Sequence, residues 1–360
     1  MQRLDRARDL AAAAGIDALL VTPGADLRYL TGYAAKPLER LTCLVVPVGA
    51  APFLVAPNLE VAAAEAAGVE LEIVGWNETD DPFAILAARL DGTARLAIDD
   101  EMWASRVLAL RAAIPGAEQV LAGPVLTELR MRKDPAEIAA LREAGAAIDR
   151  VHSRMAEWLR PGRTEREVGH DIARAIVDEG HESVDFVIVG SGPNGASPHH
   201  EVSDRVIEVG DPVVVDIGGT TPEGYCSDST RNYLAAGTVP PEYAEAYAVL
   251  HEAQAAQRAS ARAGVTAESV DRIGRDLIAN AGFGDLFIHR TGHGIGTQTH
   301  EEPYIVEGND RVLEPGMAFS IEPGIYHPGR FGARIEDIVV CTTDGLEVLN
   351  ETERQLVVLD

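Results

Sequence analysis

Four carboxylates and one imidazole in the C-terminal half of the chain could together perform metal-assisted hydrolysis. Each closes or follows a strand-like or glycine-rich segment, and in chain order they are Asp216, Asp228, His293, Glu322 and Glu336. Structural zinc sites favour thiolates and a closed coordination sphere, so this oxygen-rich set does not suit one. It suits a pair of manganese, cobalt or zinc ions that share carboxylates and activate a water between them. The set therefore predicts a hydrolase.

The segments that must position these residues contain an internal repeat. The helix-like stretch Gly162–Gly180 recurs 102 residues later as Gly264–Gly282, with matching Thr, Val, Ile and Gly positions. Each copy predicts a helix with a threonine N-cap, Thr164 or Thr266, that stops at its final glycine. Two of the four acidic residues follow each copy. A duplicated unit of helix and sheet would therefore bring two carboxylates from each half to one cleft.

The N-terminal region has the pattern of a separate scaffold domain. Helical and apolar strand patterns alternate along it, which indicates an α/β layer. They are a helix over residues 4–14 and strands over 17–22, 41–48 and 52–57. Asp134-Pro-Ala-Glu137 then opens a new helix with an N-cap and a capping glutamate. Because 360 residues are too many for one ordinary core, we predict two domains, 1–125 and 126–360.

The charge of the chain excludes several classes of partner. There are 57 acidic and 31 basic residues, a formal net charge of −26, and this field would repel nucleic acids and anionic membranes. The three cysteines contain no CxxC pair, which fits a reducing compartment. No leader-like segment and no apolar run of about 18 residues is present. We therefore predict a cytoplasmic protein without nucleic-acid or membrane partners.

Taken together, the motifs resemble the pita-bread metallopeptidases, in the branch of Xaa-Pro dipeptidases (prolidases) and Xaa-Pro aminopeptidases. The five ligands match the two-metal site of that family, and Gly15–Val21 with Leu27–Tyr33 resembles its creatinase-like N-terminal domain. The chain departs from the pattern at the spacing of Asp216 and Asp228, one residue longer than expected, and at Asn232. The resemblance implies an α/β (α+β) fold, with a creatinase-like N-terminal domain and a pseudo-twofold pita-bread catalytic domain.

The resemblance also implies roles for the site residues. The five ligands would hold two divalent ions per subunit, with Asp228 and Glu336 bridging. Manganese is the first choice for oxygen-rich ligation, with cobalt and zinc as alternatives. Glu322 would accept the proton of the attacking water. Three cleft histidines would polarise the scissile carbonyl, namely His199, His289 and His300. Arg334 would orient the site carboxylates.

The expected substrates are small proline-containing peptides, and the expected assembly is a homodimer. We predict an Xaa-Pro dipeptidase, which must bind a free carboxylate next to the proline. Arg290 could supply the cation that pairs with this carboxylate, or Arg40 could reach the carboxylate across a dimer. For both arginines, the alternative role is a surface ion pair. Three other functions are an aminopeptidase for longer peptides, a non-catalytic pita-bread binding module and a metal-free creatinase-like hydrolase. The last two would lack the ligand set.

Two further features have structural interpretations. Gly190-Ser-Gly192-Pro-Asn-Gly195 satisfies GxGxxG after a strand, but a dinucleotide site needs a helix to open at that loop. Pro193 and Pro198 argue against such a helix. Four other histidines are expected to be structural: His152, His170, His181 and His200.

Overall fold

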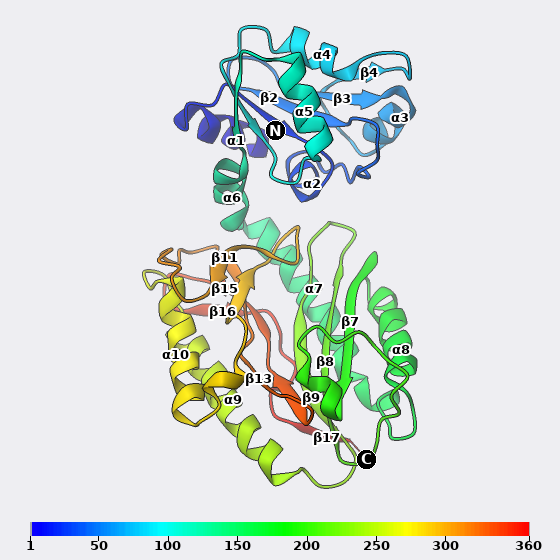
Figure 1. Cartoon of the computed structure of the whole chain (residues 1–360), viewed down its shortest axis with the longest axis vertical. Helices are drawn as coiled ribbons and strands as arrows, with labels where there is room; N and C mark the ends of the chain where they lie inside the picture. Colours follow the sequence, from blue (N-terminus) through cyan, green and yellow to red (C-terminus); the bar gives the residue numbers. More distant parts are fainter. Residues whose placement is uncertain (1, 360) are drawn as a thin grey trace. The chain divides into compact units, whose positions relative to one another are not determined.

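The computed structural model describes residues 2–359, and the chain folds into two compact units whose boundary falls between Arg130 and Met131. Figure 1 shows both units, each built of helices and strands. The boundary predicted after residue 125 falls inside helix α6 (Gly123–Met131), which also contains the boundary between the units. Among the described residues, no helix is long and apolar enough to cross a membrane.

The N-terminal unit is built around a six-stranded mixed sheet in the order β4-β3-β2-β1-β5-β6. The strands are β1 (Ala18–Val21), β2 (Cys43–Pro47), β3 (Phe53–Pro57), β4 (Glu72–Trp76), β5 (Arg95–Ile98) and β6 (Glu118–Leu121). The helices are α1 (Gln2–Ala13), α2 (Ala25–Thr31), α3 (Asn58–Ala66), α4 (Pro82–Arg89) and α5 (Ala104–Ala113). Leu19 and Val21 of β1 belong to one apolar cluster, while Ala18 and Leu20 belong to another. The central strand β1 is therefore buried on both faces of the sheet.

The C-terminal unit contains two larger sheets and a two-stranded ribbon. One sheet has the order β17-β9-β8-β7, the other has the order β11-β10-β12-β15-β16, and β13 pairs with β14. The strands of the first are β7 (Ser183–Ser191), β8 (Asp211–Thr220), β9 (Ser229–Ala235) and β17 (Val357–Leu359). Those of the second are β10 (Gly292–Gly294), β11 (Glu301–Ile305), β12 (Ala318–Ile321), β15 (Asp337–Cys341) and β16 (Leu346–Val348). The ribbon is β13 (Gly324–His327) and β14 (Phe331–Arg334).

Four long helices accompany these sheets. They are α7 (Pro135–Ser153), α8 (Glu165–Asp178), α9 (Pro241–Ser260) and α10 (Ala267–Asn280). In Figure 1, α8 lies beside the sheet of β7 and β8, and α9 and α10 lie beside the later strands. Asp134 caps α7, and its capping box with Glu137 is present as predicted. The predicted mixed α/β fold of two dissimilar units is confirmed.

The two copies of the repeat form α8 and α10, each 14 residues long. Gly180 and Gly282 follow them with φ of 116° and 89°, a left-handed conformation that favours glycine. Thr164 accepts a hydrogen bond from the backbone of Glu167, but Thr266 occupies the N-cap position without a side-chain cap bond. The sequence therefore predicted the position of the second threonine cap correctly, but the expected side-chain hydrogen bond is not formed. Each threonine also forms an isolated antiparallel bridge to a valine of its own half.

Candidate metal centre

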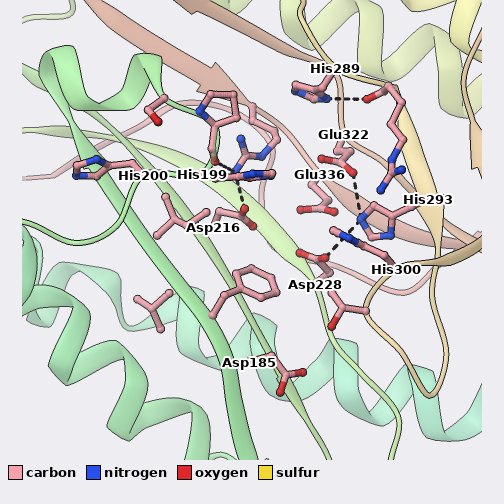
Figure 2. A pocket seen from close by; sticks show the side chains of 18 of the residues that line it. Asp185, His199, His200, Asp216, Asp228, His289, His293, His300, Glu322 and Glu336 are labelled. Atoms are coloured by element: carbon pink, nitrogen blue, oxygen red, sulfur yellow. Dashed lines mark hydrogen bonds and ion pairs between the residues drawn. The ribbon is translucent and has the colours of Figure 1, made fainter. Parts of the chain in front are cut away.

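Both sheets of the C-terminal unit deliver acidic side chains to one place (Figure 2). Asp216 lies in the middle of β8, and Asp228 directly precedes β9, the next strand of the same sheet. From the second sheet, His293 lies in β10, Glu322 follows β12, and Glu336 directly precedes β15. Both larger sheets therefore bring carboxylates to this point, as the repeat predicted.

The predicted ligand atoms lie within coordination reach of one another. Nε2 of His293 is 3.2 Å from Oε1 of Glu322 and 3.7 Å from Oδ2 of Asp228. Two groups, each with ligand atoms within 4.8 Å of one another, contain all five residues. The groups are Asp216, Asp228 and Glu336, and His293, Glu322 and Glu336. Glu336 belongs to both groups, which is the position that a bridging carboxylate requires.

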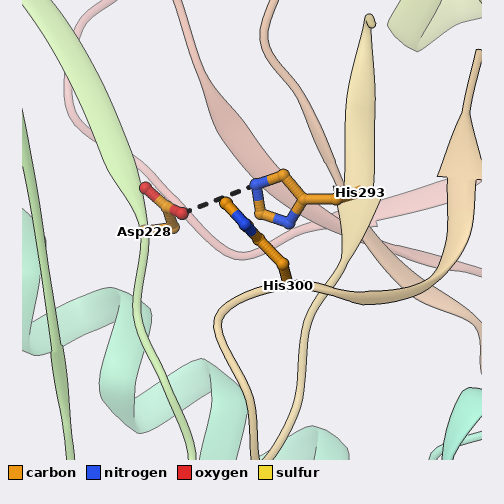
Figure 3. A group of neighbouring side chains, drawn as sticks. All are labelled: Asp228, His293 and His300. Carbon is orange, nitrogen blue, oxygen red and sulfur yellow. Dashed lines mark ion pairs between the residues drawn. The ribbon is translucent and has the colours of Figure 1, made fainter. Parts of the chain in front are cut away.

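A third such group contains a residue outside the predicted ligand set. It consists of Asp228, His293 and His300 (Figure 3). The rings of His293 and His300 are 4.0 Å apart between centroids. His300 is thus close enough to the centre to contact a substrate held there.

Unsatisfied buried oxygens show that the donor set suits cations. Oδ1 of Asp216 and Oε1 of Glu336 are buried and have no hydrogen-bond partner among the described residues. Burial, followed by repulsion from Glu336, Asp216 and Glu322, raises the pKa of Asp228. Burial, followed by repulsion from Glu322 and Asp216, likewise raises the pKa of Glu336. Divalent ions would satisfy these oxygens and relieve the repulsion.

Glu322 is held differently from the other carboxylates. Burial alone would raise its pKa, but the hydrogen bond and charge of His293 lower the pKa to about 2. The hydroxyl of Ser320 donates to Glu322 at 3.0 Å and accepts from the backbone N–H of His293, also at 3.0 Å. Glu322 is therefore ionised, and Ser320 and His293 fix its orientation.

Arg334, to which the resemblance gave the role of orienting the site carboxylates, connects them to the wall of the site. Its guanidinium donates to Oδ2 of Asp216 and, at 3.0 Å, to the hydroxyl of Thr230. That hydroxyl donates to Glu336 at 2.9 Å. Arg334 also donates to the Tyr326 hydroxyl at 2.6 Å. One buried cation thereby fixes two of the acidic groups.

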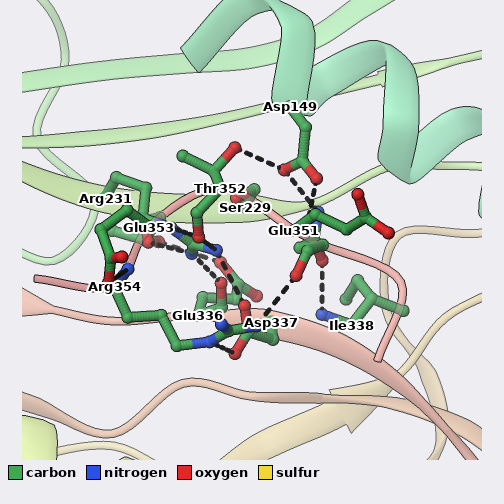
Figure 4. Close-up of polar contacts among 12 residues, drawn as sticks. Asp149, Ser229, Arg231, Glu336, Asp337, Ile338, Glu351, Thr352, Glu353 and Arg354 are labelled. Atoms are coloured by element: carbon green, nitrogen blue, oxygen red, sulfur yellow. Dashed lines mark hydrogen bonds and ion pairs between the residues drawn. The ribbon is translucent and has the colours of Figure 1, made fainter. Parts of the chain in front are cut away.

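The sequence analysis missed the residues that support the centre from behind. Asp337 is fully buried and accepts hydrogen bonds from Arg231 at 2.8 Å, Gln254 at 2.7 Å and Arg354 at 2.6 Å. Arg231 also donates to the backbone carbonyl of Glu336 (Figure 4). The signal available in the sequence was a second acid directly after Glu336. This network fixes the backbone of a ligand from the side away from the cavity.

One cavity of about 1160 Å³ contains every residue of the predicted site. The five predicted ligands line it together with His199, His289, His300, Arg290 and Arg334. His200 also lines it, but its Nε2 lies 2.7 Å from a carboxylate oxygen of buried Glu165, which suits the structural role predicted for it. Arg40 lies in the N-terminal unit, where it pairs with Glu39 and Glu78.

Two histidines of the cavity, His289 and His300, have lowered pKa values, which favours their neutral form. Burial lowers the pKa of His289, whose Nε2 lies 2.9 Å from the Tyr326 hydroxyl and whose Nδ1 lies 2.6 Å from the carbonyl of Arg290. Desolvation, with the charges of His293 and Arg290, lowers the pKa of His300 to about 4. A neutral imidazole can donate an N–H to a developing oxyanion. The protein already satisfies both nitrogens of His289, so His300 is the freer donor.

The glycines around His293 allow strands to approach closely. A Cβ on Gly292 would lie 1.9 Å from the carbonyl oxygen of Ser320, and one on Gly294 would lie 2.2 Å from that of Glu302.

The GxGxxG motif that begins at Gly190 leads into a short 3₁₀ segment, η2 (Gly192–Ala196), and not into an α-helix. The dinucleotide interpretation therefore fails on the structure as it did on the sequence.

Comparison with known proteins agrees with this geometry. Residues 139–343 match metallopeptidase family M24, and residues 3–132 match the creatinase/prolidase N-terminal domain. The chain belongs to metallopeptidase family M24 and is an enzyme of the hydrolase class.

Named relatives and solved structures resemble it over nearly their whole length. A probable dipeptidase PepE of Mycobacterium tuberculosis is 54% identical, covering 99% of this chain and 96% of the relative. An Xaa-Pro dipeptidase of Lactobacillus helveticus is 39% identical, covering 92% of each. The crystal structure of dipeptidase PepE from Mycobacterium ulcerans matches with a TM-score of 0.94 and 52% identity, covering 99% of this chain and 97% of that one.

We expect His300→Ala to slow turnover while leaving the bound metal in place. His300 lies beside His293 but outside the two groups that contain the predicted ligands. Loss of one acid–base or oxyanion group reduces rates by about 10² to 10⁴. The measurements are kcat for Ala-Pro and metal content by elemental analysis. Loss of metal together with activity would instead identify His300 as a ligand.

Proposed function

We propose that this enzyme is a two-metal peptidase that hydrolyses Xaa-Pro dipeptides. The observation that carries the proposal is the gathering of five side chains that could hold metal ions, with unsatisfied buried oxygens, in a cavity shared with His289 and His300. The relative named Xaa-Pro dipeptidase supports the choice of substrate. Non-catalytic and metal-free members of the fold would not need this complete ligand set.

The five ligands would hold two divalent ions, with Asp228 and Glu336 shared between them. Manganese is our first choice because four of the five ligands are carboxylates; cobalt and zinc are the alternatives. When bound, such a pair lowers the pKa of a water toward neutrality and so supplies the nucleophile.

The side chains around this centre would handle protons and charge. Glu322, ionised and oriented by Ser320, accepts the proton of the attacking water. His300 donates an N–H to the carbonyl oxygen as it becomes negative, and His199 lines the same cavity. His289, fixed between Tyr326 and a backbone carbonyl, shapes the pocket.

Arg290 is the proposed anchor for the free carboxylate of the dipeptide. It lines the cavity, and its guanidinium carbon lies 4.3 Å from the centre of the Tyr304 ring, a contact that holds the cation at the cavity wall. A buried carboxylate needs such a partner. An Xaa-Pro aminopeptidase for longer peptides is the alternative.

Three short peptides distinguish these alternatives. We expect kcat/KM to fall in the order Ala-Pro, Ala-Pro-Ala and Ala-Ala. Arg290→Ala is expected to reduce kcat/KM for Ala-Pro by about 10-fold to 100-fold, the effect of a lost hydrogen bond to a charged group. It should barely change the tripeptide. Arg142→Ala, which removes an exposed arginine paired with Glu347, is the control. Faster cleavage of the tripeptide would make the enzyme an aminopeptidase.

We also propose a homodimer in the cytoplasm. All three cysteines are buried and free, which supports a reducing compartment. The domain boundary is proposed near α6, close to the predicted position.

A further inference from the structure

The strand β7 contains an irregularity that turns an acidic side chain toward the cavity. Val184 lies opposite Gly219 of β8, whereas Phe186 lies opposite Gly218, so Asp185 is the extra residue of a β-bulge. In a regular strand, adjacent side chains point to opposite faces. Here both Asp185 and Phe186 line the cavity. Bulges beside active sites commonly re-aim a side chain in this way.

An apolar surface lies between Asp185 and the metal ligands. A Cβ on Gly218 would lie 2.6 Å from two ring atoms of Phe186, so the aromatic ring lies directly over that glycine. Ile188, two residues further along β7, lies opposite the ligand Asp216. The β7 side of the cavity therefore presents Phe186 and Ile188 next to the centre and a carboxylate beyond them.

The carboxylate of Asp185 is held by hydroxyl groups and not by a cation. It accepts hydrogen bonds from the hydroxyls of Thr220 at 2.7 Å and Ser183 at 3.3 Å, and among the described residues it has no ion pair with a lysine or arginine. In Figure 2, Asp185 lies at the end of the site opposite His289. A ligand cation could therefore pair with it.

The distance between Asp185 and the predicted metal ligands suits a long basic side chain of the substrate. The first residue of a dipeptide must lie against the ligands for its carbonyl to react, and β8 separates β7 from Asp228 at the start of β9. Two strand spacings amount to about 10 Å. Lysine and arginine lay their methylene stems on apolar surface while the charge stays in water. Phe186 provides that surface, and Asp185 provides the counter-charge at its outer edge.

We propose that Asp185 and Phe186 form a subsite for a basic first residue, so that Lys-Pro and Arg-Pro are preferred among Xaa-Pro dipeptides. This inference rests on the proposed function, because it assigns the Xaa side chain of that substrate. Asp185 is a specificity-determining residue in this arrangement and takes no part in the chemistry.

The test compares Lys-Pro with norleucyl-Pro, which has the same stem without the charge. For the wild-type enzyme we expect kcat/KM to be about fivefold higher for Lys-Pro, since exposed ion pairs have modest energies. Asp185→Asn should bring the ratio near one. Glu182→Gln removes one charge from the turn before β7 at a residue outside the cavity lining, and should keep the ratio. High salt should reduce the wild-type ratio.

Two outcomes would overturn the subsite: a wild-type ratio near one, or a lysine preference that survives Asp185→Asn. If Glu182→Gln lowered the ratio as much as Asp185→Asn does, the lysine preference would come from the overall negative charge of the region. That result would also overturn the subsite. The same comparison with Lys-Ala and norleucyl-Ala separates this inference from the proposed function. Suppose that both proline dipeptides are cleaved poorly, while Lys-Ala is preferred to norleucyl-Ala and the preference depends on Asp185. That result would reject Xaa-Pro specificity but keep the subsite.

Discussion

Exhaustive chelation of the enzyme is expected to abolish peptide hydrolysis, and added Mn²⁺ is expected to restore it. The cavity brings together four carboxylates, and repulsion among them raises the pKa of Asp228 and Glu336; in the proposed mechanism they hold ions that activate the attacking water. The nucleophile therefore depends on bound ions. The measurements are the rate of Ala-Pro hydrolysis and elemental analysis before and after dialysis against EDTA.

Thermal unfolding gives a second measurement that does not depend on activity. Ions that bind only the folded state raise the melting temperature by an amount that grows with their concentration relative to Kd. The metal-free protein should therefore melt at a lower temperature than the reloaded one. Full activity in protein shown to be free of metal would contradict the mechanism as a whole.

Replacing Asp228 by asparagine is expected to eliminate turnover while the fold survives. The substitution keeps the size of the side chain but removes a charge that the metal ions need. Because burial and repulsion by Glu336 and Asp216 raise the pKa of Asp228, the metal-free variant should be at least as stable as metal-free wild type. Activity on Ala-Pro, metal content and thermal unfolding of both metal-free proteins are the measurements.

The control for this variant is another carboxylate of the same cavity. Glu201 lines the cavity but belongs to none of the groups of described residues that could hold an ion. Glu201→Gln should keep both the metal and most of the activity. A substantial rate in Asp228→Asn with full metal content would show that the ligand assignment is wrong.

The sequence was sufficient to predict residues that line one cavity. Each ligand lies in a short segment with its own signature, such as the glycines that flank His293 and allow Ser320 and Glu302 to approach. The repeat indicated that two halves would contribute, and the α/β pattern of the N-terminal unit followed from alternating apolar segments.

The connections behind the site could not be predicted in the same way. Tyr326 joins Arg334 to His289, and Asp337 joins Arg231 to Arg354, and these contacts depend on sheet register and on the loops that carry His289 and Arg354. A register shift of one residue reverses which face a side chain occupies, so these partners cannot be read from local sequence. The bulge at Asp185 is a shift of this kind.

The strand β17 gives the duplicated architecture a consequence for biosynthesis. β17 (Val357–Leu359) follows the second half in sequence but pairs in parallel with β9 of the first half. The sheet that contains Asp216 therefore lacks its edge strand β17 until residues 357–359 have been synthesised. The second-half ligands His293, Glu322 and Glu336 also emerge well after the first pair. Both halves of the chain must therefore be synthesised before the five predicted ligands can come together.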